Sequence, residues 1–376
     1  MRYSSTKILT DLKEKMVFIG GPRQVGKTTL SLELIGASSK ESPAYFNWDD
    51  KSDKKKIRNS ELSFEEPLII LDEVHKFKKW RGLVKGLFDK RYPKNNFIVT
   101  GSARLDYYRF GGDSLQGRYH YHRLHPFSLS ELSKTPSKTD LQMLLKFGGF
   151  PEPLFKSNER HLRRWQREYF ERVIDDDLRD LENVKDIGSI AILADELPNR
   201  VGSILSIRNL KEDLEVAHQT VESWVQILER LYLCFRITPF GAKRIRAVKK
   251  EKKLYLWDWS QVPDDGSRFE NFIASQLLKY CHFLEDTEGY RMELQFIRDI
   301  DKREIDFVVI KDKKPLFAVE AKTKEKGLAP SISYFAERTD IPHFYQIHLG
   351  SRDQEFPDSR ARILPFAKFC QLLEMP

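Results

Sequence analysis

Cysteine is scarce in this sequence, and no stretch of it is both long and apolar. Cys234, Cys281 and Cys370 are its three cysteines; they lie far apart and show no CxxC or Cys/His ligand spacing. This excludes a disulfide framework and a cysteine zinc site, so we expect reduced, structural cysteines. The longest apolar runs, such as residues 67–71, are much shorter than the roughly 20 residues of a membrane-spanning helix. Residues 1–10 lack the apolar core and cleavage site of a signal peptide, and we expect a cytoplasmic protein without membrane contact.

The composition is that of a folded protein with more than one domain. Hydrophobic residues make up 40% of the chain and charged residues 32%, which is too apolar for a disordered chain. Domains usually contain roughly 100 to 200 residues, so the length predicts two or three. We place three, at residues 1–140, 141–262 and 263–376. The formal charge of +8 favours a polyanionic partner, although many proteins without nucleic-acid ligands share this property.

The first 135 residues alternate short apolar runs with helical patterns. Four runs have the length and composition of strands, at residues 17–20, 45–47, 68–71 and 97–100. Strands that alternate with helices predict an α/β fold, in which a parallel sheet carries helices on both faces.

A phosphate-binding loop directly follows the first of these strands. The segment GPRQVGKT matches the pattern GxxxxGK[ST] and leads straight into a helical pattern, which is the setting that the motif requires. Gly21 and Gly26 let the backbone wrap around phosphate oxygens at a helix N-terminus. We expect Lys27 to contact the β- and γ-phosphates and Thr28 to bind magnesium, with Thr29 beside them in the nucleotide site. The predicted cofactors are therefore ATP and magnesium, and the motif does not separate ATP from GTP.

Acidic and small polar residues follow two later strands. Asp72 ends the run LIIL, where a neighbouring parallel strand would deliver a second magnesium ligand, and Glu73 is placed to polarise the attacking water. Thr100 and Ser102 end the next strand, a position that carries a nucleotide sensor in AAA+ ATPases; an ordinary strand-end turn is the alternative. Arg118 is a candidate arginine finger donated between subunits of a homo-oligomer, because a delocalised cation would neutralise transition-state charge. A plain surface arginine is the alternative there.

The middle of the chain predicts helices followed by a basic ribbon. Residues 203–237 predict a short helix, a turn and a second helix with Thr220 as its N-cap, a pattern that suggests a winged-helix unit. The ribbon that follows would neutralise DNA phosphates without reading sequence, whereas a solvated hairpin whose charges deter edge pairing is the alternative. The expected DNA contacts are Lys243, Arg244, Arg246, Lys249, Lys250, Lys252 and Lys253.

Four charged residues of the last hundred form a second constellation. Glu270 lies at the start of a predicted helix, Asp306 lies on one predicted strand, and Glu320 and Lys322 lie on the same side of the next strand. If the two strands form a hairpin, Asp306, Glu320 and Lys322 converge, with Glu270 as a supporting residue. Oxygen ligands for a divalent metal beside a lysine are what hydrolysis of a phosphodiester needs. We therefore expect Glu270, Asp306 and Glu320 to bind metal, and Asp306, Glu320 and Lys322 to be catalytic.

This arrangement resembles the core of the PD-(D/E)XK nucleases, a restriction-endonuclease-like α/β fold. Ile305 stands where that pattern usually has proline, which lowers the specificity of the match. Two alternatives stay open: a retained fold that has lost its chemistry, and ordinary charges on a half-exposed sheet.

Taken together, the motifs resemble the prokaryotic AAA-type ATPases that carry a C-terminal domain of unknown function. The resemblance implies an N-terminal P-loop domain of the AAA+/RecA-like type, a helical and winged-helix-like middle, and a nuclease-like C-terminal domain. Three hypotheses follow: a DNA-associated ATPase that governs a nuclease, a nucleotide-dependent switch with an inactive nuclease fold, and a motor on nucleic acid. The segments that carry the resemblance are GPRQVGKT, LDEVH, TGSA, GR before PFSLSEL, and GGFPEP.

Overall fold

The structure, a computed structural model, divides into two compact units, Met1–Pro126 and Phe127–Pro376. The domain boundaries near residues 140 and 262 stay a prediction. The middle segment packs within the C-terminal unit; for example, Trp259 Nε1 donates to the carbonyl oxygen of Leu144 at 2.8 Å. No helix in the part of the chain that the structure describes is long and apolar enough to cross a membrane. The described residues are 2–101, 105, 115–178, 186–241 and 251–376.

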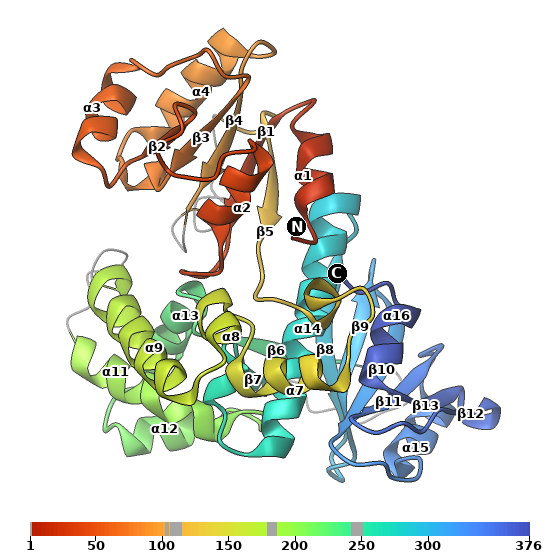
Figure 1. Cartoon of the computed structure of the whole chain (residues 1–376). Helices are drawn as coiled ribbons and strands as arrows, with labels where there is room; N and C mark the ends of the chain where they lie inside the picture. Colours follow the sequence, from red (N-terminus) through yellow and green to blue (C-terminus); the bar gives the residue numbers. More distant parts are fainter. Residues whose placement is uncertain (1, 102–104, 106–114, 179–185, 242–250) are drawn as a thin grey trace. The chain divides into compact units, whose positions relative to one another are not determined.

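The N-terminal unit is built on a five-stranded parallel sheet (Figure 1). Its strands are β1 Met16–Gly20, β2 Tyr45–Asn47, β3 Leu68–Asp72, β4 Asn96–Thr100 and β5 Tyr119–Arg123. The order β2-β3-β4-β1-β5 sets β4 between the strand before the phosphate-binding loop and the strand that ends at Asp72. The four predicted strands are confirmed. Strand β5 was missed because its sequence YHYHR has no apolar run.

Both faces of this sheet are buried. On one face, Phe18, Leu71 and Val99 pack in the same core as Trp80 and Val84 of α4. The intervening strand residues are buried as well, as expected for a parallel sheet that is covered on both sides. The helices of the unit are α1 Ser5–Asp11, α2 Lys27–Leu34, α3 Lys51–Asn59, the 3-10 turn Val74–Lys76, and α4 Trp80–Arg91.

The C-terminal unit begins with a run of helices. The predicted helix-turn-helix is present as α12 and α13, but Thr220 is not the N-cap, because α13 begins earlier, after Ala217. Gly148 ends α7 with a φ of 77°, and a Cβ there would lie 2.7 Å from Asp258 Oδ1, so the break requires glycine. The helices are α6 Leu129–Leu132, α7 Lys138–Phe147, α8 Pro151–Lys156, α9 Glu159–Arg172, a π-helix Val173–Leu178, α11 Ile187–Glu196, a 3-10 helix Leu197–Arg200, α12 Ile207–Asp213 and α13 His218–Arg230.

An eight-stranded mixed sheet completes this unit, in the order β12-β13-β11-β10-β9-β8-β6-β7. Its strands are β6 Cys234–Pro239, β7 Lys253–Leu256, β8 Met292–Arg298, β9 Glu304–Lys311, β10 Lys314–Lys322, β11 Phe344–His348, β12 Gln354–Phe356 and β13 Ala361–Pro365. The predicted hairpin is confirmed, since β9 and β10 pair antiparallel with Val319 opposite Phe307. Strands β6 and β7, which flank the ribbon predicted as a wing, pair antiparallel, and β6 also pairs with β8, so both strands extend the C-terminal sheet.

Helices enclose the central strands of this sheet. Ile332 and Phe335 of α15 share a core with Ile305 and Val308 of β9. Aromatic residues of α14 and α16 contact each other and the sheet in a second core, in which the rings of Phe272 and Phe366 are 4.9 Å apart. The helices are α14 Asp265–Glu288, α15 Pro330–Arg338 and α16 Phe366–Leu372, with 3-10 turns at Trp259–Gln261 and Pro357–Ser359.

A bulge interrupts the alternation of side chains along β9. Strand β8 advances by two residues, from Gln295 to Ile297, while its partner β9 advances by three, from Val308 to Ile305. The extra residue lets Ile305 and Val308 share one core although simple alternation would set them on opposite faces. Bulges re-aim side chains in this way, and the residue next to Ile305 is Asp306.

Candidate functional site

The phosphate-binding loop has the backbone conformation that its glycines allow. Gly21 and Gly26 have φ angles of 137° and 100°, which residues with side chains rarely adopt. A Cβ on Gly21 would lie 2.4 Å from the carbonyl oxygen of Leu124, so no larger residue fits. The loop runs directly into α2, where free backbone N–H groups favour an anion. This close-wrapped backbone fits a nucleotide phosphate.

Lys27 is held over this loop. The residue is 7% exposed, and its Nζ donates to the carbonyl oxygens of Gly21 at 2.9 Å and Pro22 at 2.6 Å. The ammonium therefore already lies where the loop would surround phosphate. Thr29 is exposed on the first turn of α2.

Arg2 is a contact of the loop that the sequence analysis missed. Its buried guanidinium donates through Nη1 to the carbonyl oxygen of Val25 at 2.9 Å, and through Nη2 to that of His125. The segment before β1 thus ties the loop to the chain after β5. No motif marks a lone arginine of this kind in a sequence.

Asp72 accepts hydrogen bonds from three hydroxyl groups. Thr28 Oγ1 donates to Oδ2 at 2.8 Å, Tyr45 OH donates to Oδ2 at 2.7 Å, and Thr100 Oγ1 donates to Oδ1. Thr100 was predicted as a sensor; in the structure it holds Asp72, and the sensor role stays a prediction. Tyr45 was missed, although its place on a predicted strand was an available signal. Ser102, the other predicted sensor residue, lies outside the described residues.

Glu73 adopts a left-handed backbone with a φ of 56°, which is uncommon for a residue with a side chain. Its Oε2 lies 3.5 Å from Lys76 Nζ and 3.6 Å from His75 Nε2. Burial raises the pKa of Glu73, with Lys27 and Lys76 acting in the opposite direction. A less acidic carboxyl is a better proton acceptor, which suits the predicted role in activating water.

Arg118 precedes β5, at the opposite end of the strands from the phosphate-binding loop. Strands β1 and β5 run parallel, with Tyr119 opposite Met16 at their start and the phosphate-binding loop at their far end. Arg118 Nε donates to Asp89 Oδ1 at 2.6 Å, and Nη2 to Oδ2 at 3.2 Å. Arg118 therefore does not contribute to the nucleotide site of its own chain. A role in the site of another subunit stays a prediction.

The structure brings together the predicted residues of the C-terminal constellation. Lys322 Nζ donates to Glu320 Oε1 at 2.5 Å, and Asp306 Oδ2 accepts from the N–H of Ala321 at 2.9 Å. Burial, together with the Asp306 carboxylate, raises the pKa of Glu270 to about 7 and that of Glu320 to about 8. Within the described residues, no three Asp, Glu, His or Cys side chains are arranged to hold a metal ion. The predicted convergence is thus present, but the predicted set of metal ligands is not.

Lys253 lies among these carboxylates. It was predicted to contact DNA, and that prediction is wrong, because the residue is 1% exposed and its Nζ lies 3.1 Å from Glu270 Oε1 and 3.5 Å from Asp306 Oδ1. Glu304 also pairs with Lys253, and Tyr255 OH donates to Glu270 Oε1 at 2.7 Å. Burial lowers the pKa of Lys253, but the surrounding carboxylates outweigh burial and raise it. Glu304 and Tyr255 were missed; an acid two residues before Asp306 was the available signal.

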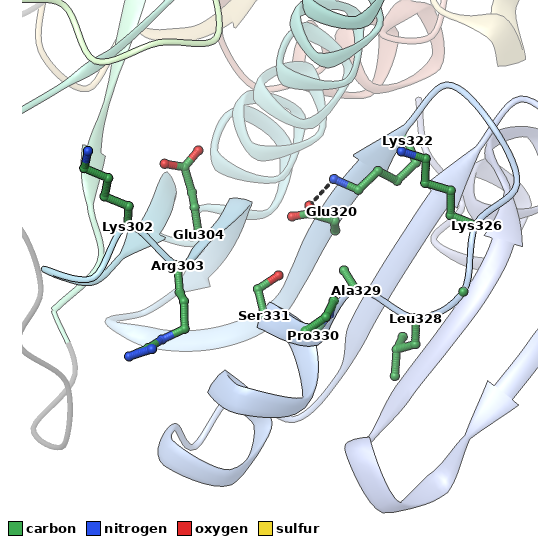
Figure 2. A pocket seen from close by; sticks show the side chains of 11 residues that line it. Lys302, Arg303, Glu304, Glu320, Lys322, Lys326, Leu328, Ala329, Pro330 and Ser331 are labelled. Carbon is green, nitrogen blue, oxygen red and sulfur yellow. Dashed lines mark hydrogen bonds and ion pairs between the residues drawn. The ribbon is translucent and has the colours of Figure 1, made fainter.

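A pocket of about 590 Å³ opens beside Glu320 and Lys322 (Figure 2). Figure 2 shows Lys302 and Arg303 at one end of the pocket and Lys322 and Lys326 at the other, with the start of α15 between them. Glu320 Oε2 is buried and has no hydrogen-bond partner in the part of the chain that the structure describes. The pocket is therefore lined by several cationic side chains together with the carboxylates of Glu304 and Glu320.

Only part of the predicted DNA-binding ribbon can be placed. Lys252 lines a cavity of about 520 Å³ together with Arg208 of α12 and His218 of α13. This cavity also contains the carboxylate of Glu222, so it is of mixed charge. The predicted contacts that lie outside the described residues are Lys243, Arg244, Arg246, Lys249 and Lys250.

Family models match three successive parts of the chain. Residues 13–133, which contain the phosphate-binding loop, Asp72 and Glu73, match an AAA domain. The N-terminal region is thus similar to AAA domains over this range. The rest matches two domains of unknown function, DUF8612 at residues 138–262 and DUF4143 at residues 265–369. The expected AAA-type P-loop fold of the N-terminal region is therefore confirmed.

Curated relatives are distant and extend beyond the aligned region. An uncharacterized protein of Mycobacterium tuberculosis is 23% identical over 279 residues, which cover 70% of this chain and 62% of that protein. The chain thus spans less than two thirds of the length of its mycobacterial relatives. An uncharacterized protein of Methanocaldococcus jannaschii is 25% identical over 339 residues, covering 73% of this chain and 70% of that protein.

Solved structures resemble the chain weakly. DnaA from Aquifex aeolicus, bound to AMPPCP, gives a TM-score of 0.32 at 15% identity and covers 59% of this chain and 85% of its own. The Orc1 protein of Aeropyrum pernix in complex with DNA gives a TM-score of 0.34 at 12% identity and covers 74% of this chain and 94% of its own. The AAA assignment rests on the family match.

Proposed function

We propose that this protein is a magnesium-dependent ATPase that binds and hydrolyses a nucleoside triphosphate in its AAA domain. The contact of Thr28 with Asp72 carries the proposal, with 2.8 Å between Oγ1 and Oδ2. A hydroxyl and a carboxylate held together beside a phosphate-binding loop are the protein ligands of a magnesium nucleotide. Bound magnesium would neutralise charge on the phosphates.

The other residues of the loop region have separable tasks. Lys27, whose ammonium lies on the loop carbonyls, would bind phosphate oxygens and keep the nucleotide in place. Glu73 would orient a water molecule and accept its proton, which its raised pKa favours. Arg2 would keep the loop in shape through Val25.

Hydrolysis by purified protein tests this proposal. Phosphate release from ATP should require magnesium and should disappear in Lys27→Ala. The same assay with GTP measures which base is preferred. Protein that binds ATP in magnesium but releases no phosphate would contradict the proposal.

We also propose that the ATPase is a nucleotide-dependent switch acting on a nucleic acid, in a homo-oligomer or alone. The net charge of +8, the predicted ribbon and the cationic pocket beside Glu320 support a polyanionic partner. The C-terminal unit would then be a docking module.

Salt dependence of DNA binding tests the ribbon. Glutamine at three of its lysines should flatten the slope of log affinity against log salt by nearly one unit for each DNA phosphate that is no longer neutralised. A matched triple change on α3 removes the same charge elsewhere and should leave the slope alone. Equal slopes for the two variants would show that the ribbon does not contact the DNA. The ribbon variant changes Lys249, Lys250 and Lys252, and the control changes Lys51, Lys54 and Lys55.

Metal-dependent cleavage of nucleic acid is a second candidate function. The convergence of Asp306, Glu320 and Lys322 favours it, whereas the contacts of Lys253 with Glu270 and Asp306 oppose it. Incubation of labelled DNA with the protein and Mg²⁺ or Mn²⁺ would show cleavage that Glu320→Ala abolishes, while ATP hydrolysis continues. Intact DNA under these conditions favours the docking module instead.

A further inference from the structure

Strand β7 delivers a buried cation into the carboxylate cluster. Lys253 is the first residue of β7, and its ammonium contacts Glu270 of α14 and both Glu304 and Asp306 of β9. These four residues come from three separate segments of the chain. The ammonium is therefore the one group that all three carboxylates share.

An ammonium at this depth is stable only with such partners. A charge that is removed from water needs opposite charges and hydrogen bonds close to it. Lys253 has both, and Glu304 has a second cationic partner, because Arg298 Nη1 donates to it at 2.9 Å. Two cations therefore contact the three carboxylates of the cluster.

The same contacts occupy the oxygens that a metal would need. Asp306 Oδ1 lies 3.5 Å from Lys253 Nζ, and Asp306 Oδ2 accepts from the N–H of Ala321 at 2.9 Å. Glu270 Oε1 accepts from both Lys253 and Tyr255. A divalent cation on these two carboxylates would meet the ammonium at close range, and like charges repel. Glu270 and Asp306 therefore do not fit a shared metal while Lys253 is in place.

We propose that Lys253 is the resident cation of this cluster and keeps divalent metal ions from Glu270 and Asp306. Strand β7 lies outside the nuclease-like hairpin of β9 and β10, so the exclusion depends on how β7 packs against α14. In the folded protein the carboxylates then serve to anchor β7, and the pocket beside Glu320 is left to bind anions without a metal. The inference concerns the C-terminal unit alone and is independent of ATP turnover.

Binding of Mn²⁺ to the full-length protein, measured by electron paramagnetic resonance without nucleotide, tests the proposal. All variants carry Asp72→Asn, so that the AAA domain lacks its carboxylate ligand for a metal. With Lys253 present, no Mn²⁺ should bind at Asp306 at up to about 1 mM free ion, the weak end of protein carboxylate sites. Lys253→Met keeps the length of the side chain without its charge and should create one site, which the further change Asp306→Asn removes. Lys252→Met, on the neighbouring residue, should create none.

Two results would overturn the proposal. One is a Mn²⁺ site in the protein that retains Lys253, if Asp306→Asn abolishes it. The other is a folded Lys253→Met protein that binds no more Mn²⁺ than its parent. If Lys253→Met does not fold, Mn²⁺ binding is compared between the protein that retains Lys253 and the same protein with Asp306→Asn. Equal Mn²⁺ binding by the two supports exclusion by Lys253, and weaker Mn²⁺ binding in Asp306→Asn contradicts it.

Discussion

The two carboxylate sites of this protein are held by partners of different charge. In the AAA domain, Asp72 accepts hydrogen bonds from three neutral hydroxyl groups. In the C-terminal unit, Glu270, Glu304 and Asp306 surround the ammonium of Lys253. Both arrangements satisfy oxygen lone pairs in a buried place, but only the second also offsets part of the negative charge.

This difference bears on what each site can bind. A carboxylate that is oriented by hydroxyl groups keeps its charge and still attracts a divalent cation. A carboxylate that is paired with a buried ammonium must lose that partner first, which leaves an uncompensated charge inside the protein. Acidic residues at strand ends can therefore look equivalent in a sequence and differ in their capacity for metal.

Removal of Lys27 should have the largest effect. Lys27→Ala takes the cation from the phosphate-binding loop, and kcat for ATP hydrolysis should fall by about 1,000-fold, the upper range for losing one charge-stabilising donor. Phosphate release at saturating ATP measures this. Lys13→Ala, an exposed lysine of the same unit, is the matched control. Lys253→Met should leave ATP hydrolysis intact. Loss of ATP hydrolysis in that variant would mean that the two sites are not independent.

Glu73→Gln should lower kcat by about 100-fold and leave nucleotide binding unchanged, because an amide keeps the shape of the side chain but cannot accept the proton of water. Binding of a fluorescent ATP analogue and phosphate release separate the two effects. Glu33→Gln on the exposed side of α2 is the control. Weaker binding with normal turnover would give Glu73 a structural role instead.

The AAA domain could be predicted because its chemistry is carried by contiguous segments. The loop sequence dictates its own backbone through glycines at positive φ, and Asp72 sits at the end of an apolar run. The partners of Asp72 could not be predicted in the same way. Tyr45 reaches it from β2, which is adjacent only after the sheet has formed. Thr100 was found as a candidate, but for another role.

The C-terminal site was predicted only in part. A hairpin and a helix sufficed to predict that Glu270, Asp306 and Glu320 lie together. Lys253 was assigned to the DNA-binding ribbon because it ends a run of lysines, and its place among the carboxylates depends on how β7 pairs with β6 and β6 with β8. The bulge at Asp306 could not be predicted either, since it depends on the register between β8 and β9.

Tyr45→Phe probes the hydroxyl partners of Asp72. The change removes one hydrogen bond to a buried carboxylate, worth about 1 kcal/mol, and leaves the ring in place. The Mg²⁺ concentration that gives half-maximal ATP hydrolysis should rise by about fivefold, with little change in kcat at saturating Mg²⁺. Tyr92→Phe removes a tyrosine hydroxyl that bonds to the carbonyl of Lys13 and should have no such effect. An equal shift in both variants would show a general loss of stability.

The smallest expected effect concerns protonation in the C-terminal unit. Burial and the Asp306 carboxylate raise the pKa of Glu320 to about 8 from an ordinary value of 4.5. The folded chain therefore holds this proton more tightly than the unfolded chain, and the free energy of unfolding should fall as pH rises from about 4.5 to about 8. Glu320→Gln cannot ionise and should lose this contribution, which is at most about 1.4 kcal/mol per pH unit.

Urea unfolding of the full-length protein between about pH 6 and about pH 8 measures the slope, with the exposed Glu337→Gln as control. The free energy of unfolding could depend less on pH in Glu320→Gln than in wild type and Glu337→Gln. This result would mean that the ammonium groups of Lys253 and Lys322 do not neutralise every carboxyl of the cluster, and that Glu320 holds a proton in the folded protein. The same slope in wild type, Glu320→Gln and Glu337→Gln would mean that Glu320 is ionised throughout. Its unpartnered oxygen would then carry negative charge, and the pocket beside it would favour a cation over the proposed anion.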